Sequence, residues 1–426
     1  HLSGASGEAF KEIYDINRLA KDFFVSNFWT AQSAHREAAA KYLKERGLKE
    51  ETIREFEIGL APTATDSLLR HLIAKKKSMG DIERAGMVFK SERGTYWDRF
   101  RGRLMFPLYN AFGKVIGFTG RVLPSEVLAT GFDSAKYVNS PETPIFHKSK
   151  LLYGFHKSKN HIRDAKAAIV VEGQMDFLMS WQDGVRNVVA SSGTALTEEH
   201  LQNLRRLADH LLLCFDSDEA GQNAAERSID LANALDFNVK LIKITGGAKD
   251  PADVVASSPG QLGDFIKNAG SAMHWYFDRY LSGKSEISEK KRGAESALGK
   301  IKRLGSPIVR EHYLRELSLR TGFSMAALEE QMRFMKVEAL APKFSKNDLP
   351  PLKVAGAVTK DRKSRLEKIS ERIVSLVCAE PALGQTVAPA ADFLAEKYRL
   401  LWKYLEAGVF KNVPPELSAE ADFVVL

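Results

Sequence analysis

Four short apolar runs decide the fold: AAIVV (167–171), NVVAS (187–191), HLLLCF (210–215) and NVKLIKI (238–244). Runs of this length, rich in Val, Ile and Leu, are typical of strands that are buried on both faces of a sheet. Between them lie three segments with helical spacing, MDFLMSWQ (175–182), TEEHLQNLRRLA (197–208) and the stretch 219–235. The alternation predicts a βαβαβαβ unit with a buried, mostly parallel sheet.

The flanking segments have different patterns. Upstream, LMFPLYNAFGKVIGFTGRV (104–122) reads as a hairpin whose turn lies at Phe112-Gly113-Lys114, and the Pro- and Ser-punctuated stretch 124–155 reads as an ordered loop. Downstream, the chain becomes helical. We therefore expect an α/β protein with an N-terminal mixed α+β subdomain, a central parallel-sheet domain and C-terminal helical subdomains. The expected ranges are 10–165, 166–256, 257–340, a linker at 341–360, and 361–426.

Composition excludes several classes of protein. The 426 residues contain no apolar run near the roughly 20 residues that span a bilayer, and the N-terminus lacks the order of a secretion signal. We therefore expect a cytoplasmic protein without a membrane partner. The two cysteines, Cys214 and Cys378, lie far apart in apolar segments. They predict buried thiols rather than a disulfide framework or a zinc site.

Charge is distributed unevenly along the chain. The formal net charge is +8, which suggests a polyanionic partner without identifying it. Residues 90–166 hold 14 Lys and Arg against 6 Asp and Glu, whereas residues 167–255 hold 7 against 14. A basic region therefore precedes an acidic one.

Carboxylates recur where the predicted strands end. In an open parallel sheet, ligands bind outside the carboxyl ends of the strands. The acids at or near these ends are Glu172, Asp176, Asp216, Asp218, Asp250 and Asp253. Such acids repel one another unless a cation or protons neutralise them, and hard oxygen ligands suit Mg²⁺ or Mn²⁺. A simpler interpretation is that Asp176, Asp218 and Glu219 are helix caps. Recurrence after three strands favours the cation site.

Motifs on both sides of this region resemble a known family. VVEGQMDFL, CFDSDEAG and KDPADVV are similar to the TOPRIM domain of bacterial DnaG primases, topoisomerases and some nucleases. DRFRGRLMFP (98–107), IGFTGRV (116–122) and KYVNSPETPIFHKSKLLYG (136–154) resemble the segment found only in primases. The resemblance to bacterial DnaG-type primases covers roughly 13–335, and it implies a DNA-directed RNA polymerase that makes RNA primers by nucleotidyl transfer.

The resemblance also implies roles for individual acids. Glu172 matches the catalytic acid, and the implied metal-binding set is Asp216, Asp218, Asp250 and Asp176. Two positions depart from the family pattern. Gln174 stands where the family often has an aromatic residue, and Ala252 occupies the second position of a motif often written DPD, so that Asp253 is the expected substitute.

In the basic segment, the resemblance implies cations that hold template or incoming nucleotide: Arg99, Arg101, Arg103, Arg121, Lys136 and Lys148. Guanidinium groups bind phosphate in a bidentate manner, which agrees with this role. Phe100, Tyr137 and Phe146 alternate with these cations, a pattern that makes base stacking in a single-strand groove plausible. For Phe100 and Phe106 we favour core positions.

The implied partners are a single-stranded DNA template, ribonucleoside triphosphates, the replicative hexameric helicase and single-strand binding protein. The family's zinc-binding domain has no counterpart here, and the tail from Asp361 resembles only the start of a helicase-binding domain. We therefore expect a fragment without zinc. Two alternatives stay open: a TOPRIM nuclease or topoisomerase, and a non-catalytic adaptor for single strands and helicase.

Overall fold

The computed structural model describes residues 4–91, 94–123, 135–215, 218–304 and 306–335, together with 370, 373, 374, 377, 388, 391, 394 and 396–406. The chain divides into two units, Ala9–Lys343 and a second unit formed by His1–Glu8 with Phe344–Leu426. All candidate site residues belong to the first unit. In the second unit, Leu401 and Trp402 of helix α19 (Glu396–Glu406) are buried.

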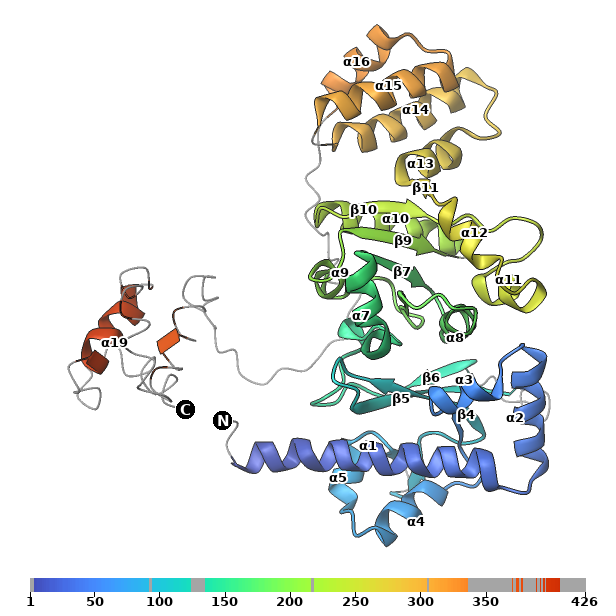
Figure 1. The fold of residues 1–426 in the computed structure, drawn as a ribbon, viewed down its shortest axis with the longest axis vertical. Coiled ribbons are helices and arrows are strands. Elements are labelled where there is room, and N and C mark those ends of the chain that lie inside the picture. Colours follow the sequence, from blue (N-terminus) through green and yellow to red (C-terminus); the bar gives the residue numbers. More distant parts are fainter. Residues whose placement is uncertain are drawn as a thin grey trace. The chain divides into compact units, whose positions relative to one another are not determined.

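The N-terminal region combines helices with an antiparallel sheet of order β1-β4-β5-β6 (Figure 1). Its helices are α1 (Gly4–Thr30), α2 (Ala34–Glu45), α3 (Glu50–Glu55), α4 (Ser67–Ala74), α5 (Met79–Arg84) and the 3₁₀ turn η1 (Lys148–Lys150). Its strands are β1 (Gly59–Leu60), β4 (Arg103–Tyr109), β5 (Val115–Val122) and β6 (Tyr137–Asn139), beside a separate ribbon of β2 (Val88–Lys90) and β3 (Tyr96–Asp98). Strand β6 lies inside the segment for which the sequence predicted a loop.

The predicted hairpin is confirmed as β4 and β5. Asn110 organises the turn, because its side-chain oxygen accepts hydrogen bonds from the backbone N–H groups of Phe112 and Lys114. Gly113 has φ of +77°, a left-handed conformation that suits glycine. Phe100 and Phe106 are buried in the core, as predicted. Phe146 is buried as well, so the expectation that it stacks on bases is wrong.

The central sheet is confirmed as mostly parallel, with order β11-β10-β9-β7-β8. Strands β8, β7, β9 and β10 are parallel neighbours, and only the short edge strand β11 is antiparallel. Its strands are β7 (Ala167–Val171), β8 (Val188–Ala190), β9 (His210–Cys214), β10 (Asn238–Leu241) and β11 (Gly270–Ser271). Its helices are α7 (Phe155–Ala165), α8 (Gln174–Gln182), α9 (Glu198–Arg205), α10 (Glu219–Ala234), α11 (Pro251–Ser257) and α12 (Leu262–Lys267). Cys214 is buried, as expected, whereas Cys378 lies outside the described residues.

Helix α8 joins the central sheet to the N-terminal region. Phe177 of α8 packs edge-on against Phe56 and Tyr153, with ring centroids 5.2 and 5.1 Å away. Gly154 lets the chain pass this cluster, because a Cβ there would lie 2.1 Å from ring atoms of Phe177. At the far end of α8, the Gln182 side chain bonds to the backbone of Lys49 and Gly47. One hydrophobic core therefore runs through both regions.

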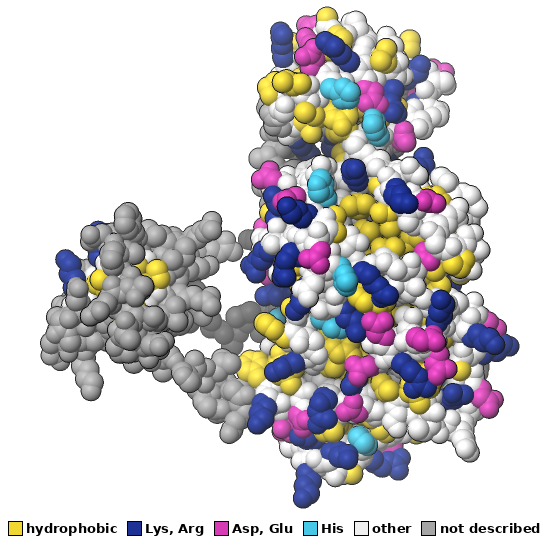
Figure 2. Space-filling view, in the orientation of Figure 1, with side chains coloured by type: hydrophobic (Ala, Val, Ile, Leu, Met, Phe, Trp, Pro, Cys, Tyr) yellow, Lys and Arg dark blue, Asp and Glu magenta, His cyan; other side chains and the backbone are white. Residues whose placement is uncertain are grey.

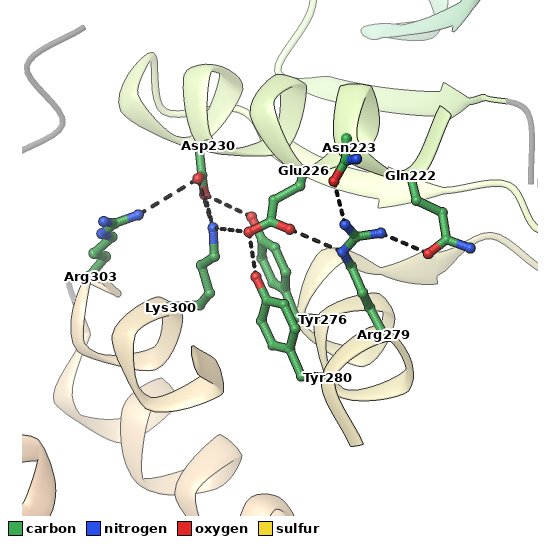
Figure 3. Close-up of polar contacts among 9 residues, drawn as sticks. All are labelled: Gln222, Asn223, Glu226, Asp230, Tyr276, Arg279, Tyr280, Lys300 and Arg303. Carbon is green, nitrogen blue, oxygen red and sulfur yellow. Dashed lines mark hydrogen bonds and ion pairs between the residues drawn. The ribbon is translucent and has the colours of Figure 1, made fainter. Parts of the chain in front are cut away.

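A polar network attaches the following helices to the central domain (Figure 3). Four helices follow: α13 (Ala272–Leu281), α14 (Ile287–Lys302), α15 (Pro307–Thr321) and α16 (Met325–Phe334). The network reaches α13 and the end of α14, and α15 and α16 pack against α14. Lys300 of α14 donates to both oxygens of Asp230 of α10, at 2.9 and 2.7 Å, and Arg279 of α13 donates to three side chains of α10. The residues of the network are Gln222, Asn223, Glu226, Asp230, Tyr276, Arg279, Tyr280, Lys300 and Arg303.

Within the described residues, no helix combines the length and apolar character needed to cross a membrane. On the visible face of the Ala9–Lys343 unit, acidic and basic side chains are interspersed (Figure 2). The uneven charge along the sequence therefore does not appear as a uniform patch on this face. The five expected domain ranges stay a prediction.

Candidate active site

The candidate catalytic acid directly follows a central strand. Glu172 comes immediately after β7, and its half-buried side chain precedes the start of α8 by two residues. Its carbonyl oxygen accepts a 2.9 Å hydrogen bond from the backbone N–H of Ser192, which follows β8. Val171 and Cys214 are register partners, so the carboxyl ends of β7 and β9 lie at the same edge of the sheet. We call this the acid edge.

Three further acids are held at helix N-termini. Asp218 caps α10 by accepting from the N–H of Gly221 at 2.7 Å, and Asp250 caps α11 by accepting from the N–H of Asp253 at 2.7 Å. Asp176, in the first turn of α8, accepts from the N–H of Gly173 at 3.0 Å. The simpler interpretation as caps is therefore correct for Asp176 and Asp218. It does not exclude ligation, because a carboxylate has further lone pairs to offer.

The structure gives less information on the other two predicted metal ligands, Asp216 and Asp253. Asp216 lies outside the described residues. Asp253 lines an open hollow with Thr245 and Gly247, whereas the neighbouring Ala252 is buried in the hydrophobic core. Among the residues that the structure does describe, no three Asp, Glu, His or Cys side chains are close enough to hold a metal.

One predicted cation, Arg121, is linked through Tyr137 to the acid in the first turn of α8. The Arg121 guanidinium stacks between Tyr42 and Tyr137, 4.8 and 5.2 Å from their ring centroids, and donates to the Tyr137 hydroxyl at 2.7 Å. Burial raises the pKa of Tyr137; Arg121 opposes this shift and the nearby Asp176 carboxylate adds to it. The N-terminal sheet therefore brings a positive group within electrostatic reach of the acid edge.

The remaining predicted cations have varied surroundings. Arg103 is buried and donates to the carbonyls of Gly120 and Ala135, and Arg99 donates to the carbonyl of Gly86. Through these contacts both arginines stabilise the N-terminal region. Of the other three, Arg101 stacks on the ring of Trp97. Lys136 is exposed and lies just before β6, and Lys148 is half-buried in η1.

Other polar groups near this edge had no role assigned to them from the sequence. Gln174 donates to the Thr119 hydroxyl of β5 at 3.2 Å, which links the two regions. In the loop after β8, the hydroxyls of Ser192 and Thr194 are buried without a hydrogen-bond partner among the described residues, and Ser192 has φ of +57°. The sequence could have indicated this loop only through its position, because it follows a strand of the parallel sheet. The loop carries no charged residue that would have drawn attention to it.

Family models match most of the first unit. The model for the N-terminal domain of the DNA primase catalytic core matches residues 24–159, and a Toprim-like model matches residues 169–255. The chain is 35% identical over 345 residues to the DNA primase of Geobacillus stearothermophilus. This match covers 80% of the chain but 55% of the relative, so the chain spans about half of that protein's length.

Solved structures are similar as well. A DNA primase domain from Pseudomonas aeruginosa is 33% identical with a TM-score of 0.63, and the match covers 75% of this chain and 99% of that domain. A DnaG primase catalytic domain solved with bound single-stranded DNA is 28% identical with a TM-score of 0.62, covering 75% of this chain and 99% of that one. The sheet order, the strand-end acids and these matches together show that the chain belongs to the bacterial DNA primase family.

Proposed function

We propose that this chain synthesises short RNA primers on a single-stranded DNA template by metal-dependent transfer of nucleotides from ribonucleoside triphosphates. The observation that carries the proposal is the junction at which the start of α8, between Glu172 and Asp176, contacts the strand pair that holds Arg121. It combines possible metal ligands with a group that can bind phosphate. The similar primase domain with bound single-stranded DNA supports the choice of template.

The residues at the acid edge fit a divalent cation in their chemistry. Glu172, Asp218 and Asp250 provide hard oxygen donors, and Asp218 and Asp250 are held in place by backbone caps. We propose that these acids, with Asp216 and Asp176, hold Mg²⁺ or Mn²⁺. A bound ion of this kind would neutralise charge on the triphosphate and on the attacking oxygen. Zinc is not part of this proposal.

In the mechanism, Glu172 accepts the proton of the attacking 3′-hydroxyl. The oxygen then forms a bond to the α-phosphorus of the incoming nucleotide, and the bond to the pyrophosphate oxygen breaks. Arg121 is placed to neutralise phosphate charge on the side of the N-terminal sheet. Lys136 precedes β6, and its carbonyl accepts from the backbone N–H of Val122, the residue after Arg121. No covalent enzyme intermediate is needed, since positioning and charge neutralisation can lower the barrier.

The expected location and protein partners are also part of this proposal. We propose that the protein acts in the cytoplasm at a replication fork, where single-strand binding protein coats the template. Contact between the segment 361–426 and the hexameric replicative helicase is also a proposal. Helix α19 supports it only as a folded element with a buried apolar side.

The test is synthesis of RNA from labelled ribonucleotides on a single-stranded template, with Mg²⁺ or Mn²⁺. We expect short RNA from the wild type and none from Glu172→Gln or Asp216→Asn. Asp209→Asn is the matched control, because Asp209 is an exposed acid that precedes β9 at the opposite edge of the sheet. It should retain synthesis.

Two other outcomes would overturn the proposal. Metal-dependent nicking or relaxation of a plasmid without ribonucleotides would indicate a TOPRIM nuclease or topoisomerase. Binding of single strands by the folded wild type, with no RNA product under any metal condition, would indicate an adaptor.

A further inference from the structure

A buried chain of hydrogen bonds crosses from the central domain to the N-terminal sheet. The amide nitrogen of Gln174 donates to the Thr119 hydroxyl at 3.2 Å, and that hydroxyl donates to the side-chain oxygen of Asn139 at 2.7 Å. Gln174 is 3% exposed and Thr119 is 1% exposed. Water therefore cannot easily replace a lost partner, and the loss of one link leaves a buried polar group unsatisfied.

The three members lie beside the candidate site on both sides of the junction. Gln174 is the first residue of α8 and stands midway between Glu172 and Asp176 in the sequence. Thr119 of β5 is two residues before Arg121, so the two side chains lie on the same face of the sheet. Their register partners in β6 are Asn139 and Tyr137. The hydrogen bonds therefore tie the beginning of α8 to the strand pair that carries the cation.

We propose that Gln174, acting through Thr119, is a positioning residue that fixes the distance between the acid edge and the Arg121–Tyr137 pair. The inference rests on the proposed function, because it concerns the geometry of that site. Packing of Phe177 already holds the middle of α8 against Phe56 and Tyr153. Apolar contacts tolerate small sliding, whereas a directed hydrogen bond at the first turn fixes the register of the carboxylates.

The same helix offers a matched comparison. Gln182, the last residue of α8, also bonds across to the N-terminal region, through the backbone N–H of Lys49 at 2.7 Å and the Thr52 hydroxyl at 3.1 Å. It lies eight residues beyond Gln174, at the end of α8 away from Glu172. If cross-domain hydrogen bonds matter only for stability, the two glutamines should have similar effects. If Gln174 is a positioning residue, only Gln174 should change the kinetics.

The experiment compares five variants of the full chain: Gln174→Leu, Thr119→Val, the double variant, Thr119→Ser and Gln182→Leu. We expect Gln174→Leu and Thr119→Val each to raise the KM for ribonucleotides or lower kcat by roughly tenfold. The double variant should be no worse than Thr119→Val alone, because that change already removes the hydrogen bond from Gln174 together with the one to Asn139. Thr119→Ser keeps the hydroxyl and should restore wild-type kinetics. Gln182→Leu should lower Tm without altering KM or kcat.

Two results would overturn the inference: kinetics unchanged in Gln174→Leu, or equal kinetic losses in Gln174→Leu and Gln182→Leu. Should the wild type make no RNA, the proposed function fails first. The link is then tested by equilibrium dialysis of labelled ATP with Mg²⁺. Weaker binding in Gln174→Leu and Thr119→Val, restored in Thr119→Ser, would uphold the inference, and equal binding in all variants would overturn it.

Discussion

The acid edge and the N-terminal sheet hold their charged side chains in different ways. Asp218 and Asp250 accept from backbone N–H groups three residues further along the chain. Arg121, by contrast, is held by Tyr42 and Tyr137, which lie on other elements of the fold. Arg103 likewise reaches the carbonyl of Ala135, 32 residues away.

The comparison indicates that the positions of the cations depend on tertiary structure more than those of the acids do. A capped carboxylate keeps its place wherever its helix begins, since the cap and the helix form together. A stacked guanidinium keeps its place only while separate elements stay packed. The acids should therefore tolerate changes in packing, and the cations should not.

The largest effect is expected at Asp218, where capping and ligation can be separated. Asn caps a helix about as well as Asp, so Asp218→Asn should leave the free energy of unfolding nearly unchanged. Its lost charge should reduce primer synthesis by about a thousandfold. Asp218→Ala should show the same loss of synthesis and also unfold about 1 kcal/mol more easily in urea. Full activity in Asp218→Asn would mean that the residue is only a cap.

A second substitution, Gly154→Ala, should weaken the packing between the central domain and the N-terminal region. In Gly154→Ala, the new Cβ meets the Phe177 ring at 2.1 Å, and Ala must adopt φ of +80°. We expect a loss of about 3 kcal/mol in the free energy of unfolding. Gly184→Ala is the control, because φ there is also positive, at +93°, but the added Cβ meets nothing within 4 Å. Equal losses in both variants would show that backbone strain, not the aromatic cluster, explains the effect.

Two histidines on helices of the central sheet, His156 of α7 and His200 of α9, make the free energy of unfolding depend on pH. Burial lowers the pKa of His156, beside Tyr109 of β4, and of His200, in α9, to about 4. The unfolded chain takes up these protons near pH 6.5 and the folded chain only near pH 4. The free energy of unfolding should therefore fall as pH drops from 6.5 to 4, by about 2 kcal/mol per histidine. Urea titrations of His200→Leu should show a smaller fall; an unchanged slope would contradict the assignment to His200.

The smallest effect is expected from Arg121→Lys, which keeps the charge but loses stacking between the two tyrosines. Single-stranded DNA should bind about threefold to tenfold more weakly at fixed salt, as measured by fluorescence anisotropy. Arg54→Lys is the matched control, since Arg54 stacks on Trp29 at 3.7 Å outside the candidate site. Similar weakening in both variants would indicate a general effect of stacked arginines.

The sequence predicted the central domain well because its signals are local. Each strand is a short apolar run, and β7 has the predicted limits. The caps at Asp218 and Asp176 were also open to prediction, since they involve a few consecutive residues. Edge strands β6 and β11 were missed, because strands of two or three residues carry too little periodicity.

The cross-domain contacts could not be predicted from the sequence. Gln174 and Thr119 are 55 residues apart, and neither residue type indicates a partner. Gln174 was noted only as a departure from the family pattern, and the structure supplies its contact. The burial of Arg103 could not be predicted for a similar reason. An arginine in a basic motif suggests a phosphate-binding residue, whereas the contacts of Arg103 with two carbonyls form only in the folded sheet.

The central claim is that the acids perform chemistry while the cations hold the nucleic acid. Its most direct test measures single-stranded DNA affinity and primer synthesis on one preparation of Glu172→Gln. We expect affinity within about twofold of the wild type, since the loss of one partly exposed acid leaves the cation contacts in place, and no detectable RNA. Undiminished synthesis would contradict the role of Glu172, and parallel loss of affinity and synthesis would contradict the division of labour between the two regions.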